Sequence, residues 1–399
     1  MITRVQVKNF RSLADVDVAL GPLTVLVGRN GVGKSTFLEA LRFVRDALRT
    51  NLEEAVSNRD GIEMIRRWSP NEPCEIEIAL TGEEVDYQNE KVRAEYSFTI
   101  LTAPNGDYRI SQEQGRIVNS FGGVKEEFRT EDGIWLVQPR RLVFDQTKVP
   151  PLDSRSLVLP SLRAFSLFYP LLNDLVAAGF YDISPHALRP PQQLSNDEWL
   201  ADNAENLAAV LRRLCQDEKS KQKILIPLAR VAEGVSDIRV QRVGGYLVTE
   251  LKHADIGRTT ATNGTPAWFE LNQESDGTLR FLGMLVALNQ NGSSGQRLIA
   301  LEEPETSLHP GVLPVIGEEL LEASARRQIL VTTQSPDLIS RFSVDELRVV
   351  ERIAGATQIG LVDEVQRETI NEQLFSAGDL LRIEGLRRAS AETAGGRRA

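Results

Sequence analysis

Apolar runs and helical stripes follow one another at both ends of the chain. Residues 23–27, Leu-Thr-Val-Leu-Val, form an apolar run that predicts a buried strand. Behind this run, apolar residues recur on one helical face at Phe37, Leu41, Val44 and Leu48. In the last third, residues 298–301 and 329–331 are further buried-strand runs, with a helical stripe at 312–320 between them. Strand, helix and strand at this spacing predict a parallel crossover, so both ends of the chain are expected to be α/β.

The middle of the chain follows two other patterns. From residue 74 to 138 apolar and polar positions alternate, and Asn105-Gly106 is a hairpin signal, which together predict an antiparallel sheet. From 161 to 228 the pattern is helical, and Asp202 with Glu205 resembles a capping box before a predicted core stripe. That stripe consists of Leu207, Val210, Leu211 and Leu214. Gly244-Gly245 predicts a second hairpin, between strands at 238–243 and 246–251.

Composition and charge narrow the class of protein. The 399 residues include 41% hydrophobic residues, without an apolar stretch of membrane-spanning length or a signal-peptide pattern at the start. We therefore expect a cytoplasmic protein with no membrane association. The net charge of −10 disfavours binding to nucleic acid by charge alone, although it leaves a local basic groove open. Cys74 and Cys215 are isolated and are expected to be reduced.

A glycine-rich loop separates the first apolar run from its helical stripe. Residues 28–35, Gly-Arg-Asn-Gly-Val-Gly-Lys-Ser, have the spacing of a phosphate-binding loop. Backbone N–H groups converge on a phosphate only in such a tight turn. Lys34 would supply charge to the β- and γ-phosphates of ATP, and Ser35 a hydroxyl to Mg²⁺. The strand and helix around the loop disfavour an accidental match. The predicted nucleotide-binding residues of the loop are Asn30, Gly31, Gly33, Lys34, Ser35 and Thr36.

Carboxylates follow the run at 298–301. The sequence Glu302-Glu303-Pro304-Glu305 places acids at the edge of the sheet where phosphates are expected. Because successive strand side chains point to opposite sides, Glu302 and Glu303 can take separate roles. We expect Glu302 in the Mg²⁺ shell, directly or through water, and Glu303 to orient and activate the attacking water. The alternative is an ordinary charged strand end.

Two further segments suit the same chemistry. Ser275-Asp276-Gly277-Thr278 precedes a predicted helix and could form an anion cradle at its N-terminus, or Ser275 or Asp276 could simply cap that helix. Gln334 follows the run at 329–331, where its amide could sense the γ-phosphate or belong to a polar loop. For His309 a helix-start or interface role is favoured over metal binding.

In this order, the motifs resemble the ABC-type ATPase heads of the SMC and RecF class. They are most similar to the prokaryotic AAA-family, or overcoming-lysogenization-defect-like, ATPases of anti-phage defence systems. The opening 7–13, Val-Lys-Asn-Phe-Arg-Ser-Leu, and 181–185, Tyr-Asp-Ile-Ser-Pro, also resemble segments of that group. The resemblance covers roughly residues 1–50 and 180–380.

The resemblance implies a head-to-head homodimer, or a higher homo-oligomer, that sandwiches two ATP molecules. Ser275 and Gly277 would then contact the γ-phosphate bound by the partner copy, and Arg11 would lie near the nucleotide. Gln334 stands where the wider class commonly has a histidine; glutamine can hydrogen-bond but cannot titrate, which implies slow hydrolysis. The glutamine that follows the first lobe in this family has three candidates here, Gln112, Gln114 and Gln138.

The resemblance also implies a fold and its divisions. We expect an α/β ABC-type ATPase head with a mixed sheet, an antiparallel β-lobe and a helical insertion. Residues 1–160 would form the N-terminal half of the head with the β-lobe, and 161–235 the helical insertion. Residues 236–385 would form the C-terminal half, and 386–399, rich in Ala, Gly and Arg, a disordered tail.

The function implied is an ATP-driven dimeric switch. It would control an effector protein encoded alongside, a nuclease in many such systems, or act on DNA in bacterial anti-phage defence. The sequence itself shows no nuclease constellation, so another chain would cut any DNA. The alternatives are a RecF-like DNA repair ATPase and a structural scaffold that binds ATP but turns it over slowly.

Overall fold

One mixed sheet runs through most of the molecule. The computed structural model describes residues 1–68, 74–85, 90–138, 152–162, 167–254, 267–290 and 298–389. Within these residues, thirteen strands pair in the order β8-β7-β6-β5-β4-β1-β2-β17-β16-β3-β15-β14-β9. Their bounds are β1 Ile2–Phe10, β2 Leu13–Ala19, β3 Leu23–Val27, β4 Glu75–Val85, β5 Lys91–Thr102, β6 Tyr108–Asn119, β7 Val124–Glu131, β8 Ile134–Val137, β9 Gly179–Tyr181, β14 Leu298–Glu302, β15 Gln328–Thr333, β16 Leu347–Ile353 and β17 Ala356–Gly360.

The centre of this sheet is parallel and buried on both faces. Strand β3 pairs in parallel with β15 and β16, and β14 pairs in parallel with β15 and β9. Leu26 packs into one apolar cluster while Val25 and Val27 pack into the other, on the opposite face. Burial on both faces explains why these strands appear in the sequence as continuous apolar runs. The predicted parallel crossover from 298–301 to 329–331 is confirmed.

The antiparallel part is an extension of the same sheet. Strand β1 pairs antiparallel with both β2 and β4, and β4 to β8 follow as antiparallel neighbours. The predicted hairpin at Asn105-Gly106 joins β5 to β6, and Gly106 has a φ of +79°. Strand β7 was not predicted, because two of its three buried side chains, Glu126 and Thr130, are polar.

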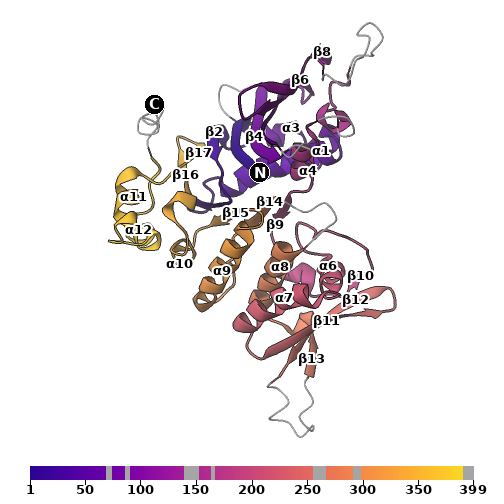
Figure 1. Ribbon diagram of the computed structural model, residues 1–399, viewed down its shortest axis with the longest axis vertical. Helices are drawn as coiled ribbons and strands as arrows, with labels where there is room; N and C mark the ends of the chain where they lie inside the picture. The colour runs from indigo at the N-terminus through magenta and orange to yellow at the C-terminus, as the bar shows by residue number, and fades with distance from the viewer. Residues whose placement is uncertain are drawn as a thin grey trace.

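Helices cover both faces of the sheet, and a second, smaller sheet lies below it in Figure 1. This sheet contains β10 (Gln192–Gln193), β11 (Val235–Val243), β12 (Tyr246–His253) and β13 (Ala267–Glu270), and the predicted Gly244-Gly245 hairpin joins β11 to β12. The helices are α1 Lys34–Arg49, α2 Leu52–Ser57, α3 Ile62–Ile65, α4 Tyr169–Val176, α5 Pro185–Leu188, α6 Leu207–Leu214, α7 Glu218–Val231, α8 Asp276–Asn289, α9 Leu313–Ser324, α10 Pro336–Ile339, α11 Glu364–Asn371 and α12 Ala377–Ile383.

One local prediction in the helical region is wrong. Helix α6 begins after Asn206, without a side-chain cap, so Asp202 and Glu205 do not form a capping box. The carboxylate of Asp202 instead accepts two hydrogen bonds from the Arg45 guanidinium, at 2.9 and 3.0 Å. This ion pair ties α1 to the segment before α6, and an arginine on a distant helix outcompetes the local backbone N–H groups because its bonds are charge-assisted. The predicted stripe at 207–214 is buried, as expected.

The mixed α/β fold class is confirmed, with the antiparallel strands at the top of Figure 1, the parallel centre in the middle and α11 and α12 to the left. Strand β9 lies inside the expected helical insertion yet belongs to the main sheet. Cys74 and Cys215 are both free. Across the described ranges, no helix combines the length and hydropathy that crossing a bilayer requires. Most of the expected tail, 390–399, lies outside the described residues.

Candidate nucleotide-binding site

The glycine-rich loop connects β3 to the N-terminus of α1, as predicted. Gly31 and Gly33 have φ values of +75° and +112°, so both glycines take conformations that other residues rarely adopt. The Lys34 ammonium donates to the carbonyl oxygens of Gly28 at 2.8 Å and Arg29 at 3.1 Å. Lys34 is only 5% exposed, and burial lowers the pKa of its ammonium despite the opposing charge of Glu303. The Lys34 ammonium is therefore buried in the loop, and phosphate oxygens could replace its carbonyl partners.

Strand β17 of the main sheet contacts this loop. The Thr357 hydroxyl, on β17, donates to the Val32 carbonyl at 2.7 Å and lies 2.8 Å from the Ser12 hydroxyl. A Cβ atom on Gly33 would lie 2.1 Å from the Thr357 hydroxyl oxygen. Sequence reasoning missed Thr357, because nothing in its local pattern indicates that it meets a loop more than 300 residues away.

The two predicted acids lie at the carboxyl end of β14 and make different contacts. Glu302 lies close to Ser35, which favours its charged form, and 3.6 Å from the Arg42 guanidinium. Burial raises the pKa of Glu302, and the nearby Asp182 adds to that rise while Ser35 and Arg42 oppose it. Glu303 follows directly after β14, and its carboxylate oxygen lies 3.6 Å from the Lys34 nitrogen. The structure thus places Ser35 near Glu302 and Lys34 near Glu303.

Gln334 lies beyond the end of β15, and Glu305 contacts the backbone there. One Glu305 carboxylate oxygen accepts hydrogen bonds from the Thr333 hydroxyl and, at 3.3 Å, from the Gln334 backbone N–H. The Gln334 side chain is exposed. Glu305 was part of the sequence motif, but the motif assigned it no role, because its contact depends on how β14 and β15 align.

Ser275 caps α8, which is the simpler of the two roles foreseen for it. Its hydroxyl accepts a hydrogen bond from the Thr278 N–H at 3.1 Å. A Cβ atom on Gly277 would lie 3.0 Å from the Ser307 carbonyl oxygen and 3.0 Å from the Leu308 side chain. The start of α8 therefore packs closely against the segment that follows the acids of β14. The role of Ser275 and Gly277 toward a partner's nucleotide stays a prediction.

The remaining candidates have no described contact with the glycine-rich loop. The Arg11 side chain donates to the Met64 carbonyl at 3.3 Å, while its neighbour Ser12 approaches Gly33, so a nucleotide contact by Arg11 stays a prediction. Gln112 and Gln114 are on β6, and six strands separate β6 from β3 in the sheet order. Gln138 follows β8, farther along the same side. His309 accepts a hydrogen bond from the Gly311 N–H at 3.1 Å, which confirms its helix-start role.

The donor set fits a magnesium nucleotide. A hydroxyl and a carboxylate, from Ser35 and Glu302, are hard oxygen ligands of the kind that Mg²⁺ prefers. Mg²⁺ commonly uses one or two such groups together with phosphate oxygens and waters, so it does not need a dedicated cluster of protein ligands. Within the described residues, no group of three or more His, Cys, Asp or Glu side chains is arranged to hold a metal.

Residues 23–340 match the family model described as "AAA domain, putative AbiEii toxin, Type IV TA system". The chain belongs to this family. The match runs from β3 through the loop and both acids at the end of β14 to the end of α10, so the site contacts that it leaves out are those from the turn between β1 and β2 and from β17.

Among curated proteins, this AAA-domain chain is similar to nucleases. It is 20% identical over 398 residues to Endonuclease GajA of Bacillus cereus, a match covering 94% of this chain and 63% of GajA. It is 19% identical to the Old nuclease of Escherichia phage P2, covering 94% of this chain and 62% of that protein. A shorter match, 59% identical over 44 residues, links it to the OLD nuclease of Thermus scotoductus, covering 11% of this chain and 8% of that protein. The chain thus spans less than two thirds of the length of these relatives.

Solved structures of SMC heads are also similar to it. A head bound to the C-terminal winged-helix domain of ScpA has a TM-score of 0.49 at 14% identity, over 92% of this chain and 99% of that one. The SMC head domain from Thermotoga maritima has a TM-score of 0.45 at 12% identity, over 91% and 99%.

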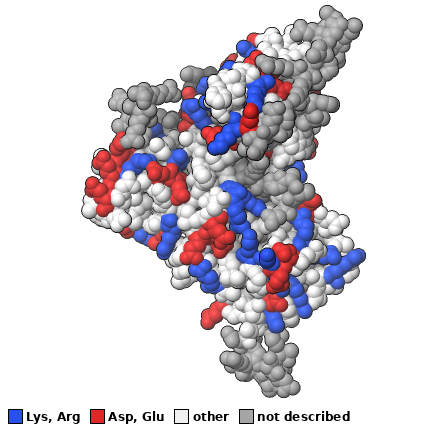
Figure 2. All heavy atoms as spheres, viewed as in Figure 1, with Lys and Arg blue, Asp and Glu red and all other residues white. Residues whose placement is uncertain are grey.

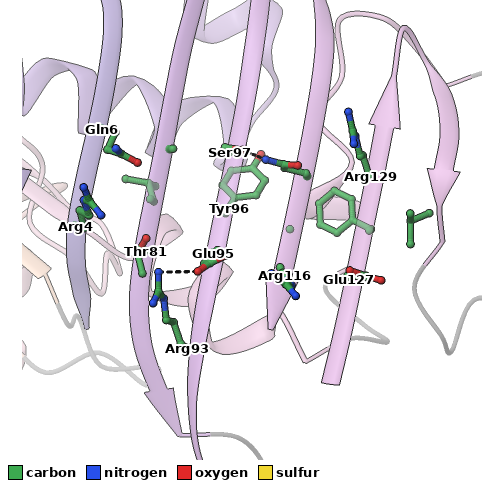
Figure 3. Close-up of a pocket in the computed structure, with 16 residues that line it drawn as sticks. Arg4, Gln6, Thr81, Arg93, Glu95, Tyr96, Ser97, Arg116, Glu127 and Arg129 are labelled. Carbon is green, nitrogen blue, oxygen red and sulfur yellow. Dashed lines mark hydrogen bonds and ion pairs between the residues drawn. The ribbon is translucent and has the colours of Figure 1, made fainter. Parts of the chain in front are cut away.

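A concave region, separate from the glycine-rich loop, lies on one face of the antiparallel strands (Figure 3). It has a volume of about 530 Å³, and the side chains of four arginines point into it, Arg4, Arg93, Arg116 and Arg129. Two of these are paired, Arg4 with Asp17 and Arg93 with Glu95. Over the described part of the face shown in Figure 2, positive and negative side chains are likewise interleaved. The arginines of this region are therefore partly neutralised.

Proposed function

We propose that this chain binds ATP with Mg²⁺ and hydrolyses it to ADP and phosphate. The observation that supports this most strongly is the convergence at one end of the parallel sheet. There, Lys34 of the loop meets Glu303, and Ser35 meets Glu302. Phosphoryl transfer depends mainly on positioning and on charge stabilisation, and these four residues supply both.

Each residue has a defined part in the proposed reaction. Lys34 exchanges the neutral carbonyl acceptors of Gly28 and Arg29 for anionic phosphate oxygens, and such an ion pair is stronger than a bond from the same ammonium to a neutral acceptor. Ser35 and Glu302 would hold Mg²⁺, which neutralises phosphate charge when bound. Glu303 orients the attacking water and accepts its proton, since its carboxylate is separate from the Ser35 contact and partly exposed.

We also propose that the chain works as a homodimeric switch in the cytoplasm. Ser275 and Gly277 would close over the nucleotide of the partner copy, and ATP hydrolysis would open the dimer again. The close packing of Gly277 on Ser307 and Leu308 supports a rigid connection between this helix start and the acids of the same chain.

The proposed output is control of a nuclease effector in anti-phage defence. The names of the relatives support a link to nucleic-acid cleavage, because Endonuclease GajA and the Old nuclease of phage P2 both match along 94% of this chain. In those proteins more than a third of the length lies outside the match.

The test measures phosphate release and oligomeric state with the purified full chain. We expect MgATP turnover by the wild type, and we expect Glu303→Gln to bind ATP, to stop turnover and to accumulate as a dimer. The matched control is Glu77→Gln, which removes an exposed charge paired with Lys8 on the outer face of the sheet and should leave turnover unchanged. A wild-type protein that neither binds ATP nor releases phosphate would contradict the proposal.

Direct action on DNA, as in a RecF-like repair ATPase, is the second candidate. The arginine-lined region of Figure 3 favours it, whereas the pairing of Arg4 and Arg93 with acids weakens it. Turnover that rises several-fold with added duplex DNA, and that falls again in Arg116→Ala, would support this candidate.

A further inference from the structure

The third acid of the motif lies where two parts of the site meet. After β14 the backbone turns sharply at Glu303, whose φ is +41°, and the Glu303 N–H donates to the Thr332 carbonyl at 3.0 Å. This turn directs the Glu305 carboxylate to the end of β15 rather than to solvent. Glu305 is thus held by strand alignment in a position that the local sequence does not specify.

Glu305 organises the backbone around Gln334 through a short chain of hydrogen bonds. Its Oε1 atom accepts from the Thr333 hydroxyl and from the Gln334 N–H, and the Thr333 oxygen in turn accepts from the Ser335 N–H at 2.9 Å. Ser335 then caps α10 by accepting from the Leu338 N–H at 3.2 Å. Residues 333–335 are therefore fixed at both ends, between Glu305 and a helix.

The two oxygens of Glu305 differ in their contacts within the described part of the chain. Its Oε2 atom is buried and makes no hydrogen bond to any of the described residues. A buried polar atom without a partner costs about 1–3 kcal/mol, which the hydrogen bonds at Oε1 help to offset. The charges of Glu305 and Glu303 both act on Lys34, which places this carboxylate within electrostatic range of the phosphate-binding lysine.

We propose that Glu305 is the positioning residue for Gln334. It fixes residues 333–335 so that the Gln334 amide faces the γ-phosphate and the attacking water, and it thereby sets the rate of hydrolysis rather than the affinity for ATP. This inference rests on the ATPase function proposed above. Glutamine has a long, flexible side chain and cannot titrate, so its contribution depends on where its backbone holds it. A displacement of about 1 Å at a reacting group can cost about 100-fold in rate.

The experiment compares four variants by two readouts, single-turnover phosphate release at saturating MgATP and equilibrium binding of a fluorescent ATP analogue. The variants are Glu305→Ala, Glu305→Gln, Gln334→Ala and the double alanine variant. Glu305→Ala should lower the single-turnover rate about 10–100-fold and leave the dissociation constant within about threefold. Glu305→Gln keeps one oxygen acceptor for Thr333 and Gln334, so it should stay within about threefold of the wild-type rate. In the Gln334→Ala background, Glu305→Ala should have little further effect.

Two further variants keep the result interpretable. Thr333→Val removes one donor to Glu305 without changing the carboxylate, and it should show a smaller loss of rate in the same direction. Glu322→Ala, on the exposed side of α9, is the matched control for loss of a glutamate and should leave the rate unchanged. Melting temperatures of all variants separate misfolding from loss of positioning.

Three outcomes would overturn the inference. These are a full rate in Glu305→Ala, a Glu305→Gln variant as slow as the alanine variant, and independent effects of Glu305→Ala and Gln334→Ala that multiply. If Glu303→Gln abolishes turnover while Glu305→Ala does not, only this inference fails. If the wild type shows no turnover, the proposed ATPase function itself fails.

Discussion

Replacing Gly33 with alanine should destabilise the protein more than the same replacement at Gly31, two residues away. Both glycines have positive φ, and an L side chain in that region costs about 1–2 kcal/mol. At Gly31 none of the described residues has an atom within 4 Å of the added Cβ atom, so we expect this backbone cost alone. At Gly33 the Cβ atom would lie 2.1 Å from the Thr357 Oγ1 and 2.8 Å from its Cγ2. Such overpacking adds about 1–3 kcal/mol, for a total of about 2–5 kcal/mol.

The assay is denaturant unfolding of both variants, with ATP binding measured alongside. Gly33→Ala should lower the free energy of unfolding by about 2–5 kcal/mol and lose ATP binding, whereas Gly31→Ala should lose about 1–2 kcal/mol. Thr357→Ala removes both clashing atoms, so in the double variant it should recover the overlap part but not the backbone part. Equal losses in Gly33→Ala and Gly31→Ala, or no recovery in the double variant, would refute the contact between β17 and the loop.

Three other variants test the site and the β-lobe. Lys34→Ala removes a charge-assisted phosphate contact of about 1.5–3 kcal/mol and should weaken ATP binding at least about tenfold. Fluorescence titration measures this change, and an unchanged affinity would contradict the phosphate role of Lys34. Glu303→Gln should trap ATP in a closed dimer, seen as a shift in light-scattering mass that wild type loses on hydrolysis; a monomer with bound ATP would contradict this. Burial raises the pKa of Glu113 to about 7, above its value in the unfolded chain. Between about pH 4.5 and 7 the folded state therefore keeps a proton that the unfolded state has lost, so the free energy of unfolding falls as the pH rises through this range. Glu113→Gln should flatten that fall in a series of urea unfolding curves, and an unchanged slope would show that Glu113 is not its source.

The features predicted from sequence are those set by neighbours along the chain. The loop at 28–35, strand β3, helix α1 and both predicted hairpins each depend on a few adjacent residues, and all were identified correctly. Their signals are strong because apolar runs, helical stripes and glycine turns arise from local geometry. The pairing of Ser35 with Glu302 was also foreseeable, since the carboxyl ends of parallel strands meet at one edge.

The features that were missed depend on contacts between distant segments. Strand β7 has polar residues on its buried side, and β9 has only three residues, so neither shows a usable pattern. The sequence around Asp202 resembles a helix cap, but in the fold its carboxylate accepts hydrogen bonds from Arg45. Thr357 and Glu305 have ordinary surroundings in the sequence, and only the sheet order brings them to the loop and to Gln334.

The position of β3 in the sheet has a consequence for how the protein is made. Leu23 pairs with Ile329, and Val25 pairs with Leu347, so both sheet neighbours of β3 leave the ribosome long after it does. At about 5–20 residues per second, the glycine loop waits about 15–60 s for the strands that complete it. During that interval a nascent chain exposes an apolar strand with two open edges, so a chain cut short before β15 should aggregate and should not retain nucleotide.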